Sequence, residues 1–559
     1  MKKILLLSLT LFSFACTKKQ ARSQAGGTLK IGVSQEFEIL NPVISQMATS
    51  SYIFTMATGA LTTIGEDWKW RCVLCTELPT FENKMVKKLP GGKLLVNWEI
   101  LPNAQWGDGT PLTGNDVKFS WMVGQHPNVS VGQRDTYSRV IALEVDKDNP
   151  KKFSMTFKES RYDYYQLGTF YILPKHLEEP IFEKTKNQAS SYEKQTLYNT
   201  DPGNPGLYFG PYVVKEIKLG SHIVLVKNPK YFGEAPKINQ IVVKYVANTQ
   251  ALEANLLSGE IDMISEMGLF FDQLLGLEKK FRDNTELGSK YRISLKQGTI
   301  YEHITFNFKD PIVKDKKVRQ ALAYGLDREK MVKALFDGRQ EVALHNIHPL
   351  DPYYTDNVKR YSYDLNKAQQ LLEEAGWKVN PSDGMRYKDK KPLELTLMTT
   401  AQNQLRERIQ VYVQAEWKKL GVEVKIKNEP ARVFFGETVR KGTFPNLAMF
   451  AWVSSPDNPP QSTMHSKEIP TAKNGHSGQN SGGYVNAEAD ALLDKIPLEF
   501  NFDKRKLMVQ RLQEIYAEEL PALPLNLRAD FAIVPSKMTG YETTGHQFYS
   551  TQYSWRWNY

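Results

Sequence analysis

Alternating apolar and polar residues predict strands along much of the chain. The segment TLKIGVS at 28–34 shows this pattern and opens the fold. Three further apolar segments, at 93–101, 222–232 and 238–246, also read as strands, the last two joined by a turn that contains proline. Helices are expected within 50–74 and after residue 246, because the apolar residues there recur with a longer period than in a strand.

Helical periodicity is strongest in the second half of the chain. Leu252 and Leu256 share one face of a helix that should end at Gly259. After residue 310 an apolar stripe continues through two helices, with Asp327 placed to cap the second. Residues 392–453 read as strand, helix, strand and strand, which predicts a largely parallel sheet covered by helices.

The stretch WGDGTPLTGNDVKFSW, residues 106–121, reads as a strand, a turn and a helix start. Asp108 and Gly109 are turn formers. Thr113 and Asp116 have the spacing of a capping box. The two aspartates could also act as a general acid and base, but the turn and the cap already explain them, so the structural interpretation is preferred.

The N-terminus predicts export. Lys2 and Lys3 precede an apolar run that ends at residue 15 and is too short to span a bilayer, so 1–15 reads as a signal peptide. Cys16 follows, and the polar segment 16–27 resembles the tether of a bacterial lipoprotein, although Ser13 stands where leucine is usual. A lipid on Cys16 would hold the protein on a membrane, inner or outer, at the periplasmic side of the envelope. An ordinary secretory signal with an incidental cysteine is the alternative.

Composition excludes several classes of protein. The chain has 559 residues, of which 41% are hydrophobic and 24% charged, so it should bury a large core in two or three domains. The net charge of +10 falls to +8 when Lys2 and Lys3 leave with the signal peptide. Lysines and acids are interspersed, so no phosphate-binding stripe is seen and nucleic acid is not an expected partner.

Two cysteines remain, Cys72 and Cys75, in the sequence RCVLC. Such a pair can form a local disulfide, act as a redox couple or supply half of a zinc site. A second cysteine pair for zinc is lacking, and an oxidising environment favours the disulfide. Two free buried thiols are the other possibility.

Catalytic motifs are missing from the sequence. It contains no GxxxxGK[ST] loop, no HExxH and no GxSxG. His345 and His348 in HNIHPL could ligate a metal, but the neighbouring residues indicate a loop, so no metal, no cofactor and no enzymatic activity are expected. The polar segment 454–484 is long enough to predict a functional or disordered loop.

Several stretches in order resemble the family 5 extracellular solute-binding proteins, the peptide, nickel and opine receptors of ABC importers. The segment 106–121 is similar to the family's hallmark, and 209–264, ITFNFKDPIVKDKKVRQALAYGLDREKMV and YDLNKAQQLLEEAGW continue the likeness. The resemblance implies an α/β fold, a two-lobed periplasmic-binding-protein fold of type II with an extra small α+β domain, three domains in all. The expected boundaries are 28–60, 205–297 and 527–559 for lobe I, 61–204 for the small second domain and 298–526 for lobe II, with crossovers near 298 and 526 as the hinge.

The resemblance also suggests which residues meet the ligand. In the family's peptide receptors an aspartate pairs with the ligand's α-amino group, and aligning AWVSSPDNPP on that turn puts Trp452 in its place. Asp457 could substitute from the turn, or serve the turn's own structure. Tyr301 and His303 on the crossover strand are the next candidates. Two further candidates lie where lobe I should meet the cleft, Glu36 and Asn41.

The preferred hypothesis is a lipid-anchored, monomeric receptor that delivers a peptide or other small polar solute to an ABC permease. One alternative is an exported thiol-redox protein that uses Cys72 and Cys75, against which the missing exchange partners count. Another alternative keeps the fold but assigns a structural role in the envelope.

Overall fold

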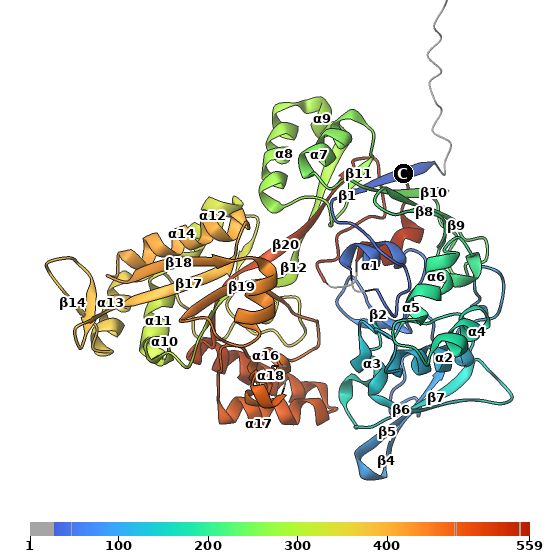
Figure 1. Ribbon diagram of the computed structural model, residues 1–559, viewed down its shortest axis with the longest axis horizontal. Helices are drawn as coiled ribbons and strands as arrows, with labels where there is room; N and C mark the ends of the chain where they lie inside the picture. The colour runs from blue at the N-terminus through green and yellow to red at the C-terminus, as the bar shows by residue number, and fades with distance from the viewer. Residues whose placement is uncertain (1–26, 46, 475, 477, 547–548) are drawn as a thin grey trace, which may run out of the picture.

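One mixed sheet runs through the molecule and carries both lobes of a two-lobed structure (Figure 1). Its strands, in spatial order, are β18 (Glu423–Glu429), β17 (Glu394–Thr400), β19 (Leu447–Val453), β12 (Tyr291–Phe306), β20 (Ala522–Pro535), β11 (Met263–Ile264), β1 (Thr28–Val33), β10 (Gln240–Tyr245), β9 (His222–Lys227) and β8 (Tyr212–Lys218), with β13 (Glu341–Val342) paired to β20. We call the part from β11 to β8 lobe I and the part from β18 to β19 lobe II.

The computed structural model describes residues 27–45, 47–474, 476, 478–546 and 549–559. The predicted signal peptide, Cys16 and nearly all of the tether lie outside these residues, so the lipid anchor stays a prediction. Within the described part, no helix is both long and apolar enough to cross a membrane.

Two long antiparallel strands, β12 and β20, join the lobes. Their pairing runs from Tyr291 opposite Pro535 to Thr305 opposite Ala522, and its register shifts between Gln297 and Tyr301. On the lobe II side β12 also pairs with β19, and on the lobe I side β20 pairs with β11. The irregular pairing therefore lies where the shared strands pass from one lobe to the other.

Helices cover the lobe II sheet in the way that the apolar stripes predicted. They are α10 (Pro311–Lys314), α11 (Lys316–Tyr324), α12 (Arg328–Phe336), α13 (Leu365–Glu374) and α14 (Gln404–Lys418). Asp327 caps α12 by accepting a hydrogen bond from the Lys330 amide at 2.9 Å. The pairs of β17 with β18 and with β19 are parallel, as expected for 392–453. The sheet as a whole is mixed, because β12 and β20 pair antiparallel to each other and to their neighbours.

In lobe I, α1 (Ala48–Phe54) lies below the sheet, and α7 (Thr249–Ser258), α8 (Phe271–Asp283) and α9 (Thr285–Lys290) lie above the shared strands (Figure 1). Gly259 ends α7 in the left-handed conformation with φ of 80°, as its position predicted. Leu252, Leu256 and Leu277 belong to the same apolar cluster as the lobe II core. These helices therefore buttress the crossing strands.

A smaller unit below lobe I, which we call the small domain, has a four-stranded antiparallel sheet and a separate antiparallel pair of strands. Its elements are β2 (Thr62–Ile64), β3 (Trp70–Cys72), β4 (Val86–Leu89), β5 (Lys93–Glu99), β6 (Val140–Val145), β7 (Lys152–Phe157), α2 (Gly114–Gln125), α3 (Arg134–Ser138), α4 (Lys175–Thr185), α5 (Tyr192–Gln195) and α6 (Leu197–Thr200). Thr113 and Asp116 form the capping box of α2. A disulfide joins Cys72 to Cys75 at the end of β3.

The remaining elements of lobe II lie at its lower end and its outer edge. They are β14 (Lys378–Val379), β15 (Arg386–Lys388), β16 (Lys391–Pro392), α15 (Ala431–Val433), a π-helix at Phe434–Val439, α16 (Gln461–Met464), α17 (Ala487–Lys495) and α18 (Phe502–Glu519). The predicted polar loop 454–484 thus contains the short helix α16. It leads from the end of β19 to α17, beside the small domain (Figure 1).

Candidate functional site

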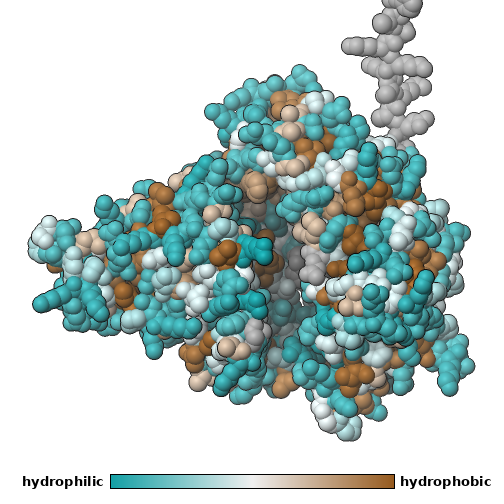
Figure 2. All heavy atoms as spheres, viewed as in Figure 1, coloured by the Kyte–Doolittle hydropathy of each residue, from teal (hydrophilic) through white to brown (hydrophobic). Residues whose placement is uncertain are grey.

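A deep hollow separates the two lobes in the space-filling view (Figure 2). Three residues that the sequence singled out, Tyr301, His303 and Trp452, line one pocket of lobe II. We call it the aromatic pocket. Its other lining residues come from the 454–484 segment and the end of α18: Thr463, Met464, Gln479, Asn480, Ser481, Gly482, Tyr484, Tyr516, Pro521 and Ala522, with Thr305 from β12.

Strand geometry explains why these side chains meet. Tyr301 and His303 are two positions apart on β12, so both point to the same face of the sheet. Tyr301 lies directly opposite Trp452 on β19. The rings form a chain, with centroids 5.1 Å apart for Tyr301 and His303, 4.6 Å for His303 and Phe450, and 5.4 Å for Phe450 and Trp452. The aromatic residues of the pocket therefore continue through Phe450 into the buried core.

His303 is the polar group of this wall. It is 1% exposed, and among the described residues no hydrogen bond to its Nδ1 is found. Burial lowers the pKa of His303 to about 4, so the ring is neutral at physiological pH. A neutral imidazole can offer a single hydrogen bond inside an apolar wall, and such a wall suits an uncharged group better than an ion.

The opposite face of β12 holds an ion-pair network. Glu302 is 2% exposed and accepts hydrogen bonds from Arg406 at 2.7 Å and from Arg528 at 2.8 Å. Burial alone would raise the pKa of Glu302, but Arg528 and Arg406 outweigh it and hold that pKa below its ordinary value. The network fixes the crossing strand to α14 and to β20.

Asp457 connects lobe II to the small domain and does not line the aromatic pocket. Its carboxylate accepts hydrogen bonds from Gln166 at 2.8 Å and from Tyr165 at 3.0 Å, and its carbonyl accepts one from Tyr162 at 2.8 Å. Its amide donates to Asp351 at 3.0 Å, and burial raises its pKa. With a φ of 56°, the residue makes a structural turn, which is one of the two roles considered for it, and it also bridges lobe II and the small domain.

Neither lobe I candidate joins the aromatic pocket. Asn41 is fully buried, donates to Thr196 Oγ1 at 3.2 Å and accepts from the Val43 amide, so its side chain makes contacts within the scaffold. Glu36 is exposed beside the turn at Gly220 that joins β8 to β9.

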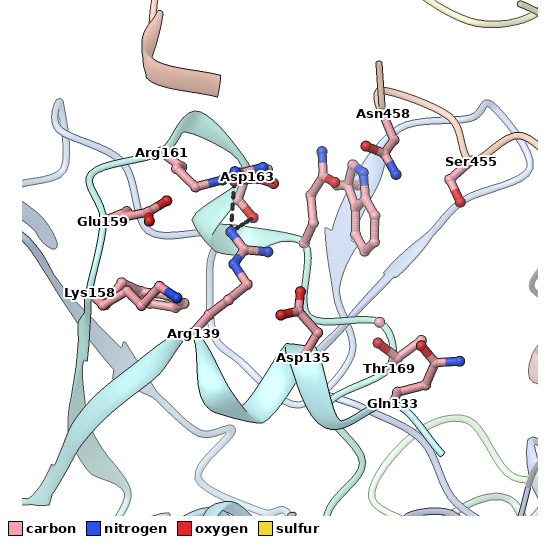
Figure 3. Close-up of a pocket in the computed structure, with 14 residues that line it drawn as sticks. Gln133, Asp135, Arg139, Lys158, Glu159, Arg161, Asp163, Thr169, Ser455 and Asn458 are labelled. Carbon is pink, nitrogen blue, oxygen red and sulfur yellow. Dashed lines mark hydrogen bonds and ion pairs between the residues drawn. The ribbon is translucent and has the colours of Figure 1, made fainter. Parts of the chain in front are cut away.

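A second, polar pocket of about 400 Å³ lies where the small domain meets lobe II (Figure 3). Ser455 and Asn458 reach it from the lobe II loop, and the remaining walls belong to the small domain. Arg139, Arg161 and Asp163 form its inner wall. Sequence reasoning missed this pocket, because its residues come from segments some 300 positions apart and share no motif; the long polar loop after β19 was the one usable signal.

His345 and His348, the two histidines considered as metal ligands, make contacts within the protein. His345 Nε2 bonds to the Thr355 carbonyl at 2.8 Å, and the His348 ring stacks on Trp68 with centroids 4.7 Å apart. Across the part of the chain that the structure covers, no group of three or more His, Cys, Asp or Glu residues could hold a metal ion. Asp108 accepts a hydrogen bond from the Thr110 amide at 2.9 Å, as a turn residue does.

Two lobes joined by paired strands, with a lined cleft between them, define a binding protein that encloses a solute. Residues 96–473 match the bacterial extracellular solute-binding proteins, family 5, middle region, and the chain belongs to that family. Family membership favours the binding hypothesis over the thiol-redox alternative.

Relatives cover nearly the whole chain. It is 29% identical to the oligopeptide-binding protein AppA of Bacillus subtilis, across 96% of this chain and 94% of AppA. The solved structure of AppA with a nonapeptide is 27% identical over 96% of this chain and 99% of that one, with a TM-score of 0.70. The oligopeptide-binding protein of Thermus thermophilus, solved with a pentapeptide, is 31% identical over 95% of this chain and 96% of that one, also with a TM-score of 0.70.

Proposed function

We propose that the chain captures a peptide or peptide-like solute in the interlobe cleft and delivers it to the permease of an ABC importer. The observation that carries this proposal is the convergence of Tyr301, His303 and Trp452 on one pocket of lobe II. Relatives that cover nearly the whole chain are oligopeptide-binding proteins, which supports a peptide as the ligand. The protein binds and releases its ligand without chemical change.

We propose that the irregular pairing of β12 with β20 is the hinge, and that the domain boundaries follow the division expected from the sequence. The register shift after Gln297 lies close to the crossover expected near 298, and Leu527, which pairs with Tyr301, lies close to that near 526. Ligand contacts with both lobes would stabilise a closed arrangement through differential affinity. Lipidation of Cys16 would keep the receptor beside its permease.

Native mass spectrometry of the protein truncated after Cys16 tests the ligand class. The expected result is a co-purifying peptide, released by mild denaturation and present at near-stoichiometric amount. A thermal-shift screen then compares peptides with opines, sugars and metal chelates, because a ligand raises the melting temperature by binding only the native state. If peptides give no shift while another class does, the peptide assignment is wrong although the binding class stands.

A further inference from the structure

Ion pairs form the inner wall of the polar pocket, at the junction of the small domain and lobe II. Arg139 Nη2 lies 2.7 Å from Asp163 Oδ1, and Arg161 Nη2 lies 3.0 Å from Asp163 Oδ2. Asp163 is buried, while both arginines are part-exposed to the pocket. Figure 3 shows the Arg139 guanidinium near the middle of the pocket, below Asp163.

Two guanidinium groups share a single carboxylate, so this inner wall carries one surplus positive charge. The pKa of Asp163 is lowered, because Arg139 and Arg161 outweigh the effect of burial, and the carboxylate stays ionised. Among the described residues, no hydrogen bond is found to Nε or Nη1 of Arg139, whose bonds to Asp163 both come from Nη2. Each of these remaining N–H groups can donate one charge-assisted hydrogen bond to a carboxylate oxygen of an occupant.

The rim of the pocket carries one negative charge in total, which opposes the charge of the inner wall from a more exposed position. Its ionisable side chains are Asp135, Lys158 and Glu159, and all three residues are exposed. Charges in water are screened, whereas the half-buried pair of arginines acts at short range on anything inside the pocket. The inner wall therefore favours an anionic group on an occupant.

One stretch of lobe II, residues 452–484, contributes side chains to both pockets. The lobe II loop that contributes Ser455 and Asn458 to the polar pocket follows β19, the strand that carries Trp452 of the aromatic pocket. Trp452 and Ser455 are three positions apart, so their Cα atoms lie at most about 11 Å apart. We take a peptide on the order of five residues as the length that reaches from Trp452 past Ser455 into the polar pocket. The hydrogen bond from Gln166 to the Asp457 carboxylate holds this loop beside the small domain.

We propose that the polar pocket is a subsite of the small domain that binds a carboxylate of the bound peptide through Arg139, with Arg161 supplying the second positive charge. The inference rests on the proposed peptide-binding function. It specifies the ligand as a peptide of about five residues or more, with an acidic group at the end that enters the polar pocket. The carboxylate can be the peptide's C-terminus or an acidic side chain.

Calorimetry with synthetic peptides tests the subsite. The probes are pentapeptides of alanine with a central phenylalanine, in two matched pairs. The first pair differs at the C-terminus, which is a free acid in one peptide and an amide in the other. Both peptides of the second pair are C-terminal amides, and they differ in carrying either a glutamate or a glutamine at a distal position. We expect the unmodified protein to bind one acidic peptide at least about tenfold more tightly than its neutral partner. The amide comparison identifies a terminal carboxylate and the glutamine comparison a side chain.

Arg139→Gln should reduce this preference to about twofold or less, and Arg161→Gln should reduce it similarly, because each removes the surplus charge. Thermal unfolding of both variants shows whether they are folded, and either folded variant suffices. Lys158→Gln makes the same change of charge on the exposed rim and should leave the preference within about twofold of the original.

The outcomes separate the two proposals. Peptides that bind equally well with and without the carboxylate overturn the subsite but leave the receptor function standing. The subsite is also overturned if the preference for the acidic peptide survives both arginine substitutions. The same holds if Lys158→Gln abolishes that preference as fully as the arginine substitutions do. If none of the pentapeptides binds the unmodified protein, the peptide function itself fails and the subsite fails with it.

Discussion

The hydrogen bonds around Asp457 should determine how firmly lobe II is held against the small domain. Asp457→Ala removes the acceptor of Gln166 at 2.8 Å and of Tyr165 at 3.0 Å. A hydrogen bond to a charged group contributes about 1.5–3 kcal/mol, and both donors are half-buried and regain water, so the lower figure applies to each. The loss of about 3 kcal/mol changes the equilibrium between joined and separated domains by roughly 100-fold.

Backbone strain adds to this effect. Asp457 has a φ of 56°, a region in which alanine costs about 1 kcal/mol more than a residue that tolerates it. Asp457→Asn is the matched control, because asparagine tolerates this conformation and keeps one side-chain oxygen. Its effect should lie between those of the original residue and alanine.

Distance measurement between two spin labels can follow the separation. Lys87 in β4 and Lys495 in α17 are exposed and lie on the two sides of the junction, so each can be replaced by a labelled cysteine. Cys72 and Cys75 are joined in a disulfide and should not take the label. Asp457→Ala should broaden the distances and weaken ligand binding; an unchanged distribution with affinity within twofold would refute the bridging role.

Three further predictions concern the cleft and the strands that cross it. Trp452→Ala should weaken ligand binding about tenfold by calorimetry, since about 50 Å² of lost indole contact corresponds to about 1.3 kcal/mol, whereas Trp452→Phe should lose less. Glu302→Gln should lower the free energy of unfolding by about 3–5 kcal/mol in urea titrations, because it leaves Arg406 and Arg528 without their buried partner. Because its pKa is lowered, the stabilisation from Glu302 is present above the unfolded pKa of about 4.3 and is lost as the pH falls through the lower folded value. His303 should remain neutral by NMR down to about pH 5, and its contribution to stability should fall as the pH drops from about 6.5, the unfolded pKa, to about 4.

Local pattern predicted most elements, because their causes are local. The capping box at Thr113, the helix end at Gly259 and the strands of 392–453 depend on residues within one or two turns of each other. The shared face of Tyr301 and His303 likewise follows from strand period alone.

Roles that depend on distant partners could not be predicted in this way. Asn41 is fixed by Thr196, 155 positions away, and Asp457 by Tyr165, 292 positions away. A polar residue near a cleft looks the same in sequence whether its hydrogen bonds are free or already taken. The mixed sheet was missed for a related reason, since the antiparallel pairing of β12 with β20 joins segments separated by more than 200 residues.

Paired crossing strands also restrict how the lobes can move. A strand that slid past its neighbour by one residue would turn Tyr301 and His303 away from the cleft and bring Glu302 to face it. The ladder between β12 and β20 opposes such sliding, while a ribbon of two strands can still twist and bend across its plane. Domain motion can therefore alter the angle between the cleft walls without altering which side chains those walls display, so the receptor keeps one chemical specificity at every degree of closure.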